Sequence, residues 1–527
     1  MAEEFRRLPI GVQSFEIMRQ EHLLYVDKTR YVYRLAHSGR QYFLSRPRRF
    51  GKSLFLSTLK AYWEGKQELF EGLEIAELEK NKEGAFEPYP VFYFDFNGQN
   101  YQVDTALEDI LAEHLRRWEK IYGGDGSLPL SERFRNLMAA AQEKTGKGCV
   151  VLIDEYDKPL LEVLENDKLE EHNKSVFKGF FGTLKSYDEY LQFVFITGVT
   201  KFSKVSIFSD LNQLNDISFN KDFAGICGIT ETELTAVFAP EIEKLAGGMS
   251  LSYEECIAEL RKMYDGYHFH PEADGVYNPF SLLKAFFGEE MGAYWFATGT
   301  PTFLVRRMKS MHFDVRQFEG GMLHATSAAL SDYRAENPDI VPLLYQTGYL
   351  TLFGYDARKR RYTLGFPNEE VKYGFLESLL PVYTPASVPG RGTDIFSLDD
   401  SLEAGDTDRV REILTALFDS IPYTTDDAPF EHYFQSVLYI VFTLLGQHTH
   451  CEVHSSRGRA DCVLETDRFV YIFEFKVDKS AQEALAQING CGYMIPYEAG
   501  GKQLYKIGAS FDEELKTLKE WLVAAEE

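Results

Sequence analysis

A short basic segment near the N-terminus combines the residue types that bind phosphate groups. The segment SRPRRFGKSL (residues 45–54) follows YFLS (residues 42–45), an apolar run that is typical of a strand. A phosphate-binding loop needs backbone N–H groups around the phosphates, a lysine for the terminal charges and a hydroxyl for Mg²⁺. Gly51, Lys52 and Ser53 supply these groups at the start of an expected helix, where the helix dipole favours anions. The candidate nucleotide contacts here are Arg48, Arg49, Gly51, Lys52, Ser53 and Leu54.

This candidate loop departs from the general phosphate-loop pattern at one position. The pattern has its first glycine where this chain has Arg46, and that glycine normally permits a tight turn. Arg46, Arg48 and Arg49 make the loop unusually basic, which favours either phosphate or another polyanion. A Gly-Lys-Ser triplet alone is weak support for a nucleotide site, so the prediction depends on a partner motif elsewhere in the chain.

That partner is an acidic pair that ends an apolar run about 100 residues downstream. The segment VVLIDEYDKPL (residues 150–160) indicates a buried strand that ends with Asp154 and Glu155. The second acidic motif of a P-loop ATPase occupies this place, so Asp154 would hold Mg²⁺ and Glu155 would polarise the attacking water. The alternative interpretation is a strand-end carboxylate that caps the next turn. Thr197 ends a further expected strand and is placed either to sense the γ-phosphate or to serve a structural role.

A second set of charged residues lies near the C-terminus, in RGRADCVLETDRFVYIFEFKVDKS (residues 457–480). Hydrolysis of a phosphodiester needs a metal that polarises the phosphate and generates hydroxide, with a cation near the developing charge. Asp461 starts one expected strand, whereas Glu474 and Lys476 lie two residues apart on a later strand and project from the same face. Asp461 and Glu474, with the Phe475 carbonyl, would hold Mg²⁺ through hard oxygen ligands. Lys476 would orient the water or stabilise the transition state.

Two further residues are candidates for the same site. Glu431, on an expected helix before the strands, would add a carboxylate, and Gln487, on the following helix, would support the site. A Glu-x-Lys pair is common in alternating strands, and the alternative is a surface ion pair between Glu474 and Lys476. The apolar residues on the opposite face of that strand favour a site, since the charged face must be either solvated or functional. The candidate catalytic residues are Asp461, Glu474, Lys476, Gln487, Glu431 and Glu155, and the candidate metal ligands are Ser53, Asp154, Asp461 and Glu474.

The elements that position these residues indicate an α/β protein. In the N-terminal third, short β-rich runs alternate with helical patterns, which predicts a P-loop NTPase parallel sheet with helices on both faces. We expect strands at residues 42–45, 90–96, 149–154 and 191–198, and helices near residues 105–122, 131–144 and 175–186. The middle region is predicted to be mostly helical and the C-terminal part to be a small α/β domain. The candidate domains are residues 1–228, 229–383 and 384–527, with the Pro- and Gly-rich segment 384–393 as a linker.

Composition limits the classes of protein to which the chain can belong. Its 527 residues are too many for one core, and its 44% of hydrophobic residues is ordinary for a globular protein. No apolar run reaches the roughly 18 residues of a membrane span, and the N-terminus lacks the apolar stretch of a secretory signal. The six cysteines form no Cys-x-x-Cys pair, which suits a reducing cytoplasm. The net charge of −25 disfavours a polyanionic partner overall, although residues 1–60 hold twelve Lys or Arg against five Asp or Glu.

Several motifs resemble those of the bacterial AAA-ATPase-like proteins. These motifs are YVDKT (residues 25–29), SRPRRFGKSL (45–54), VVLIDEYDKPL (150–160), ITGVTKFSKVSIFSDLN (196–212), YDGYHF (264–269) and VYNPFSLL (276–283). In that family a PD-(D/E)xK nuclease-superfamily domain follows at the C-terminus, and GRADCVLE, YIFEFK and ALAQI are similar to it. The resemblance implies a restriction-endonuclease-like C-terminal fold. It also implies nucleotide and Mg²⁺ contacts at Lys52, Ser53 and Asp154, and a nuclease site at Asp461, Glu474, Lys476 and Gln487.

These observations predict an ATP-binding, ATP-hydrolysing cytoplasmic protein that cleaves DNA or RNA under the control of ATP. ATP and Mg²⁺ are the expected cofactors and a nucleic acid is the expected partner, with no membrane; the oligomeric state stays open. Nucleotide state would reposition the C-terminal domain, with residues 384–393 as the hinge. The alternative is a nucleotide-dependent switch or scaffold whose nuclease fold binds nucleic acid or protein without cleaving it.

Overall fold

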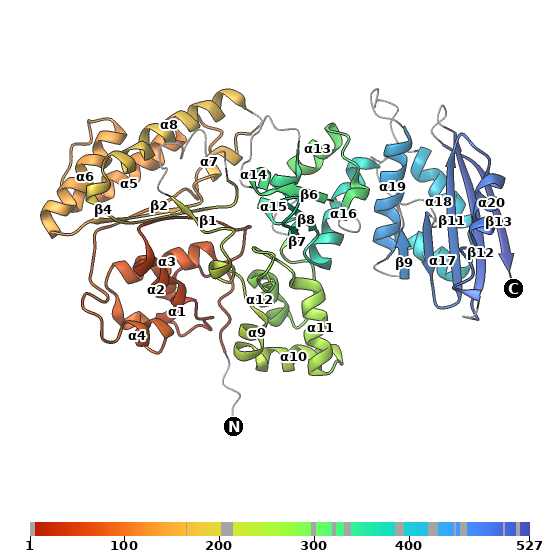
Figure 1. Ribbon diagram of the computed structural model, residues 1–527, viewed down its shortest axis with the longest axis horizontal. Coiled ribbons are helices and arrows are strands. Elements are labelled where there is room, and N and C mark those ends of the chain that lie inside the picture. The colour runs from red at the N-terminus through yellow and green to blue at the C-terminus, as the bar shows by residue number, and fades with distance from the viewer. Residues whose placement is uncertain are drawn as a thin grey trace. The chain divides into compact units, whose positions relative to one another are not determined.

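The computed structural model contains two compact units. One unit comprises Met1–Thr298 and Leu323–Glu370, and the other comprises Gly299–Met322 and Val371–Glu527. Figure 1 labels the elements of both units. The described residues are 6–164, 166–201, 214–296, 302–318, 323–330, 339–384, 395–419, 430–446, 450–453, 461–498, 501–512 and 517–526.

The first unit is built on a five-stranded parallel sheet. Its strands pair in the order β2-β3-β4-β1-β5, and every neighbouring pair is parallel. The strands are β1 (Gln41–Ser45), β2 (Val91–Asp95), β3 (Cys149–Asp154), β4 (Leu191–Gly198) and β5 (Asn215–Asp216). All six residues of β3 are buried, as expected for a strand that is covered on both faces. The predicted parallel sheet is therefore confirmed, and β5 is an additional edge strand that local patterns did not predict.

Helices cover both faces of this sheet (Figure 1). One face carries α5 (Ala106–Tyr122), α6 (Leu130–Thr145) and α8 (Asp167–Ser186), and the other carries α1 (Phe15–Gln20), α2 (Thr29–Ser38), α3 (Lys52–Trp63) and α4 (Glu74–Glu79). Three short helices complete this part: η1 (Gln67–Phe70), α7 (Lys158–Leu161) and η2 (Asp188–Tyr190). Helix α8 begins well before the predicted residue 175, because the side chain of Asn166 accepts a hydrogen bond from the Leu169 N–H and caps it.

A helical region follows the sheet in the same unit. Its elements are η3 (Lys221–Phe223), α9 (Glu231–Val237), α10 (Ala239–Met249), α11 (Tyr253–Tyr264) and α12 (Pro279–Gly288). Helices α9 and α11 start with capping boxes, in which Thr230 pairs with Glu233 and Ser252 pairs with Glu255. Their apolar faces bury one common hydrophobic cluster with α10 and α12. The predicted helical character of the middle region is confirmed.

A small antiparallel sheet also belongs to the first unit and was not predicted. Its strands β6 (Leu323–Thr326), β7 (Thr351–Asp356) and β8 (Arg361–Gly365) pair in the order β6-β8-β7. The helices α14 (Ser327–Leu330) and α15 (Val341–Thr347) lie between β6 and β7 in the sequence. Because β6 pairs with residues almost forty positions away, local residue patterns do not reveal this sheet.

The second unit is a mixed α/β domain around another five-stranded sheet. Its strands pair in the order β13-β12-β11-β10-β9; β11 and β12 are parallel, and the other neighbours are antiparallel. The strands are β9 (His450–Val453), β10 (Cys462–Glu465), β11 (Phe469–Val477), β12 (Gln503–Asp512) and β13 (Thr517–Glu526). The helices are α13 (Thr302–Ser310), η5 (Val315–Phe318), most of α16 (Glu369–Tyr383), α17 (Ile395–Ala404), α18 (Thr407–Asp419), α19 (Phe430–Leu445) and α20 (Ala481–Cys491).

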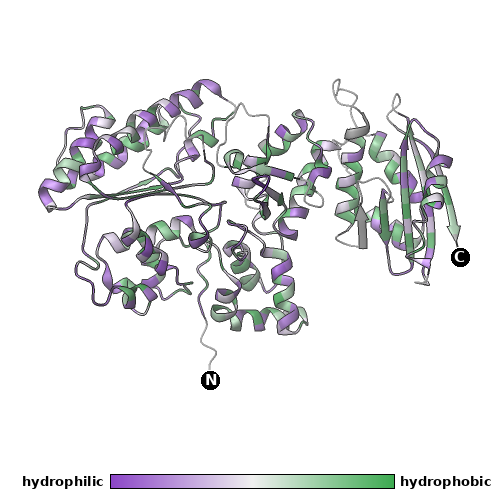
Figure 2. Ribbon diagram, in the orientation of Figure 1, coloured by the Kyte–Doolittle hydropathy of each residue, from purple (hydrophilic) through white to green (hydrophobic). Residues whose placement is uncertain are grey.

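The hydropathy of the strands and helices explains why the sheet of the second unit is covered by helices. Figure 2 shows the strands of its sheet as largely hydrophobic, whereas helices such as α20 alternate hydrophobic and hydrophilic residues. A sheet that is buried under amphipathic helices has this pattern. The predicted small α/β domain is confirmed, and β13 is a strand that the sequence pattern did not predict.

The two units group the chain differently from the three predicted domains, whose boundaries at residues 228 and 383 stay predictions. Residues 385–393, which form nearly all of the predicted linker, lie outside the described residues. Within the described part of the chain, no helix combines the length and the apolar content of a membrane span. Every cysteine whose side chain is described is a free thiol.

Candidate functional site

The loop between β1 and α3, predicted to bind phosphate, ends in a tight turn at the start of the helix. Helix α3 starts at Lys52 and is preceded by Gly51, whose φ of 93° is left-handed. A Cβ on Gly51 would meet no atom within 4 Å, so the backbone conformation, and not the available space, favours glycine there. Arg49 is also left-handed, with φ of 68°. The N-terminus of α3 therefore follows a tight turn, and its free N–H groups favour an anion.

Lys52 lies across this loop. Its side chain is 3% exposed, and its Nζ donates to the Pro47 carbonyl at 3.1 Å and lies 3.9 Å from Glu155 Oε1. The ammonium group thus interacts with the loop and with the acidic motif at the end of β3. Leu54, two residues further along α3, is half-buried and lines a neighbouring cavity.

The arginines of the loop differ in their surroundings. Arg46 is 1% exposed; its guanidinium donates to the carbonyls of Ser45, Ser218 and Phe223 and lies 3.8 Å from the centre of the Phe269 ring. These contacts bury the Arg46 guanidinium. Arg46 therefore stabilises the loop and does not contribute to its exposed basic surface. Arg48 and Arg49 are exposed, which leaves their side chains accessible to a ligand.

Asp154 and Ser53 meet at the end of β3. Asp154 is 1% exposed, accepts a hydrogen bond from the Ser53 hydroxyl, and has its Oδ2 3.4 Å from the Tyr93 hydroxyl. Burial and the charge of Glu155 raise the pKa of Asp154 to about 6, while Ser53 and Lys52 oppose this shift. Its Oδ1 is buried and has no hydrogen-bond partner among the described residues. A hydroxyl beside a carboxylate with an unsatisfied oxygen fits the coordination of Mg²⁺.

Glu155 and Thr197 lie beside this pair. Glu155 has a left-handed φ of 53°, which is unusual for a residue with a side chain and often marks a functional position. The register of the sheet pairs Ile153 with Ile196 and Leu44 with Thr197, so Thr197 lies between the ends of β3 and β1. Thr197 is fully buried, and its hydroxyl lacks a partner among the described residues. The sheet thus brings Thr197 to the same edge as Asp154.

Asp157 is a residue of this edge that was missed from the sequence. It is fully buried and accepts hydrogen bonds from the N–H groups of Val199 and Thr200 and from the Thr200 hydroxyl. Burial and the charge of Glu155 raise its pKa to about 6. Asp157 ties the end of β4 to the loop after β3 and so holds Thr197 near Asp154. The Asp-Glu-x-Asp spacing of residues 154–157 was a weak signal for it, because such spacing is common in turns.

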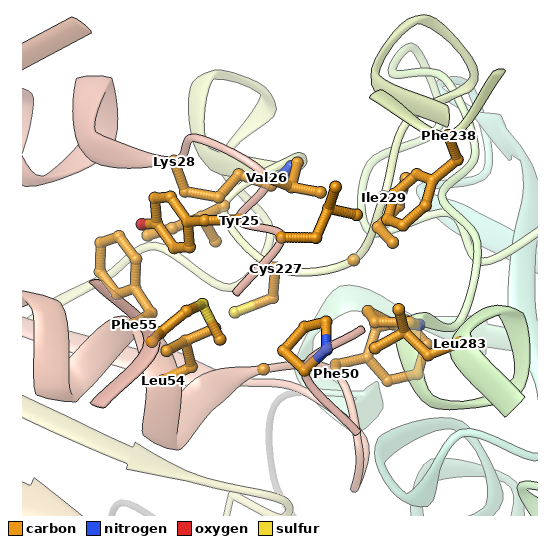
Figure 3. Close-up of a pocket in the computed structure, with 17 residues that line it drawn as sticks. Tyr25, Val26, Lys28, Phe50, Leu54, Phe55, Cys227, Ile229, Phe238 and Leu283 are labelled. Atoms are coloured by element: carbon orange, nitrogen blue, oxygen red, sulfur yellow. The ribbon is translucent and has the colours of Figure 1, made fainter. Parts of the chain in front are cut away.

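A mostly apolar cavity adjoins the phosphate loop (Figure 3). Phe50, Leu54 and Phe55 line it from the loop and α3, Tyr25 and Val26 from the N-terminal segment, and Leu283 from α12. The empty space in it is about 590 Å³, including its open mouth. Lys28 is a polar residue of the wall, and its Nζ is held by Glu233 at 2.6 Å and by the Gly225 carbonyl at 2.8 Å. The cavity was not predicted, since its walls come from distant segments.

The charged residues of the C-terminal domain converge near the C-terminal end of β11. Asp461 Oδ2 accepts a hydrogen bond from the Phe475 N–H at 2.8 Å. Lys476 Nζ donates to Glu474 Oε1 and to Gln487 Oε1, both at 2.7 Å, so α20 contributes to the same cluster. The ion pair that was the alternative interpretation is therefore present, but it is not on the surface: the side chain of Glu474 is 2% exposed and that of Lys476 is 20% exposed.

This cluster fits a divalent cation through two carboxylates. Glu474 Oε2 is buried and has no hydrogen-bond partner among the described residues. Burial and the charge of Glu474 raise the pKa of Asp461 to about 6, opposed by the Phe475 N–H, Lys476 and Arg316. Among the described side chains, no group of three or more His, Cys, Asp or Glu is arranged to hold a metal. Glu431 lies in α19, but its side chain is outside the described residues.

Comparisons with known proteins agree with this architecture. Residues 9–208 match the family model described as a predicted AAA-ATPase, and residues 429–521 match that of the PD-(D/E)XK nuclease superfamily. A protein of Azotobacter chroococcum mcd 1, described as an uncharacterized protein in the vnfD 5' region, is 37% identical over 531 residues, covering 98% of this chain and 99% of its own length. No solved structure matches the chain.

The chain belongs to the family of AAA-ATPase-like proteins that carry a C-terminal PD-(D/E)XK nuclease-superfamily domain. The match to the first model contains the phosphate loop and the end of β3, and the match to the second contains β11 and α20. The family resemblance predicted from the motifs is thereby confirmed.

Proposed function

We propose that the protein binds ATP with Mg²⁺ in its first unit and cleaves phosphodiester bonds of a nucleic acid in its C-terminal domain, under the control of the nucleotide. The proposed nuclease activity is supported by the buried cluster of Asp461, Glu474 and Lys476. In this cluster Glu474 Oε2 has no hydrogen-bond partner among the described residues. A buried carboxylate oxygen without a partner is costly unless a ligand satisfies it. A divalent cation is the ligand that this cluster suits best.

At the nucleotide site, each residue has a distinct task. The N–H groups of residues 51–53 and the Lys52 ammonium would bind the phosphates, with Lys52 leaving the Pro47 carbonyl. Ser53 and Asp154 would hold Mg²⁺, which neutralises phosphate charge when it is bound. Glu155 would orient the attacking water, and Thr197 would contact the γ-phosphate. The apolar cavity beside the loop would hold the base, because a heteroaromatic ring gains from burial against Phe50 and Leu54.

At the nuclease site, Asp461 and Glu474 would hold a divalent cation, which lowers the pKa of a bound water and polarises the phosphate. Lys476 would position that water or stabilise the negative charge that develops on the phosphate. Gln487 accepts a hydrogen bond from Lys476 and so keeps the ammonium beside the carboxylates. Gln487 is therefore a positioning residue in this scheme.

The second candidate function is a nucleotide-dependent switch or scaffold whose nuclease fold binds without cleaving. It is favoured by the two-carboxylate metal site, since a third His, Cys, Asp or Glu ligand is lacking among the described side chains. The net charge of −25 also favours it. Cleavage assays separate the two functions.

The test is to incubate labelled single- and double-stranded DNA and RNA with the full-length protein, with and without ATP and with Mg²⁺ or Mn²⁺. Glu474→Gln removes one proposed ligand and should reduce cleavage by about 100-fold or more, since even changes behind the metal ligands cost 10–100-fold. Glu465→Gln, on the adjacent strand β10 and paired with Lys502 at 2.9 Å, is the matched control and should cleave like the wild type. Equal cleavage by both variants, or none by the wild type under any condition, would contradict the nuclease proposal.

A further inference from the structure

The hairpin between β7 and β8 carries the longest uninterrupted run of basic residues in this acidic chain. Arg358, Lys359, Arg360 and Arg361 follow one another, and the first three are exposed at the turn. The Asp356 carboxylate accepts hydrogen bonds from the N–H groups of Arg358 and Lys359, both at 3.0 Å, and so shapes the turn. Among the described residues none forms an ion pair with these four side chains, although the Lys359 N–H, and then the charges of Lys359 and Arg361, lower the pKa of Asp356.

Aromatic side chains accompany this basic turn. Phe353 and Tyr355 lie on β7, which is an edge strand, and are 57% and 45% exposed. The Phe353 ring packs on Gly365. A Cβ at position 365 would lie 2.6 Å from this ring, so the glycine leaves room for it on the sheet. Tyr355 packs against Tyr362 of β8, with ring centres 4.7 Å apart. Both rings are thus held on the sheet, and their exposed parts lie on the strand that leads into the basic turn.

We propose that this hairpin binds single-stranded nucleic acid, with Arg358–Arg361 on the phosphates and Phe353 and Tyr355 stacked against bases. The inference rests on the proposed function, for which it supplies a substrate contact in the first unit. Adjacent cations attract the regularly spaced phosphates of a strand, and exposed rings stack on bases whatever their sequence. An acidic peptide or an anionic membrane would use the cations but offers no heteroaromatic faces for the two rings.

An oligonucleotide-binding assay tests the role of the hairpin independently of cleavage. Fluorescence anisotropy would follow full-length protein with fluorescein-labelled oligonucleotides of about 20 nucleotides, a length above the usual site size of such surfaces. Single-stranded DNA, single-stranded RNA and duplex DNA form separate arms, in EDTA so that nothing is cleaved, and co-sedimentation with phosphatidylserine vesicles forms a fourth arm. The test variant combines Arg358→Gln, Lys359→Gln and Arg360→Gln. The control combines Arg116→Gln, Arg117→Gln and Lys120→Gln on α5, which are exposed and change the net charge equally.

We expect the hairpin variant to bind single strands at least about tenfold more weakly and to lose about 2 units of salt slope, at about 0.7 for each of three phosphate contacts. The α5 control should bind like the wild type. Phe353→Ala should weaken binding about tenfold and leave the salt slope unchanged, because it removes stacking and no charge.

Three outcomes overturn the inference in distinguishable ways. If the hairpin variant binds like the wild type while Glu474-dependent cleavage persists, the hairpin assignment fails and the proposed function stands. If the wild type neither binds nor cleaves any oligonucleotide, both fail together. If the hairpin variant loses binding only to phosphatidylserine vesicles and not to oligonucleotides, the partner is a membrane surface and not a nucleic acid.

Discussion

Arg46 shows that a residue at a motif position can have a role other than the one the motif suggests. The general phosphate-loop pattern has a glycine there, and the basic run of which Arg46 is part favoured an anion contact. The guanidinium instead satisfies three backbone carbonyls from Ser45, Ser218 and Phe223, and burial lowers its pKa. The loop is therefore tied to distant segments by a side chain that a glycine does not have.

Arg46→Gly would restore the general pattern, and we expect it to lower the free energy of unfolding by about 3 kcal/mol or more. Each buried carbonyl left without a donor costs about 1–3 kcal/mol. Urea unfolding followed by circular dichroism would measure the change. Arg49→Gly is the matched control: Arg49 is exposed and left-handed, so glycine there should change stability by less than about 1 kcal/mol. Equal losses in the two variants would show that Arg46 is not a structural support.

At the scale of elements, the start of α16 is connected to the phosphate loop by a chain of hydrogen bonds. Glu370, in the first turn of α16, accepts from the Ser281 hydroxyl at 2.8 Å and from the Trp295 N–H at 2.7 Å. The Trp295 indole in turn donates to the Arg48 carbonyl at 3.0 Å. From Val371 onward α16 belongs to the second unit. Within the first unit, these hydrogen bonds connect the backbone of the loop to the first turn of α16.

The raised pKa of Glu370 predicts that the stability of the folded protein depends on pH. Burial raises its pKa to about 7, so the folded protein binds this proton more tightly than the unfolded chain does. Stability must then fall as pH rises between the unfolded pKa, near 4.5, and about 7. Relative to Glu370→Gln, the wild type should lose about 1.4 kcal/mol per pH unit in this window.

Urea titrations at several values between about pH 5 and 8 would measure this difference. Glu369→Gln is the matched control, because it removes the neighbouring carboxylate of the same turn, which pairs with Lys262 at 3.2 Å and is 30% exposed. A difference between wild type and Glu370→Gln that is the same at every pH would contradict the assignment of the titration to Glu370.

At the scale of the whole molecule, the two units carry one candidate Mg²⁺-dependent site each. The phosphate loop and the end of β3 belong to the first unit, and the cluster on β11 and α20 belongs to the second. Each proposed ligand should stabilise the folded state through its own site, because a ligand that binds only the native protein raises its stability by mass action.

Thermal melts of single-site variants would test this independence. A ligand at about 100 times its Kd adds about 2.7 kcal/mol of stability, so ATP with Mg²⁺ should raise the wild-type Tm by several degrees, and Mn²⁺ without ATP should also raise it. Lys52→Ala should abolish the ATP shift and keep the Mn²⁺ shift, and Glu474→Gln should do the reverse. If either variant removes both shifts, the sites are not separate.

Much of the fold could be predicted because strands and helices depend on local periodicity. Strand β3 has the predicted bounds Cys149–Asp154, and α3 begins at the predicted Lys52. Gly51, Lys52 and Ser53 lie next to one another in the chain, and Glu474 and Lys476 share a face of one strand. For these residues the covalent sequence and the strand period alone bring the side chains together.

Only the tertiary structure decided the features that join distant segments. Arg46 faces inward because Ser218 and Phe223 provide acceptors, and the cavity exists because the N-terminal segment and α12 approach the loop. The pairings of β6 with β8 and of β11 with β12 are likewise contacts between residues far apart in the sequence. A residue's type and its neighbours limit its local conformation, but the partners available to a buried polar group depend on which segments pack against it.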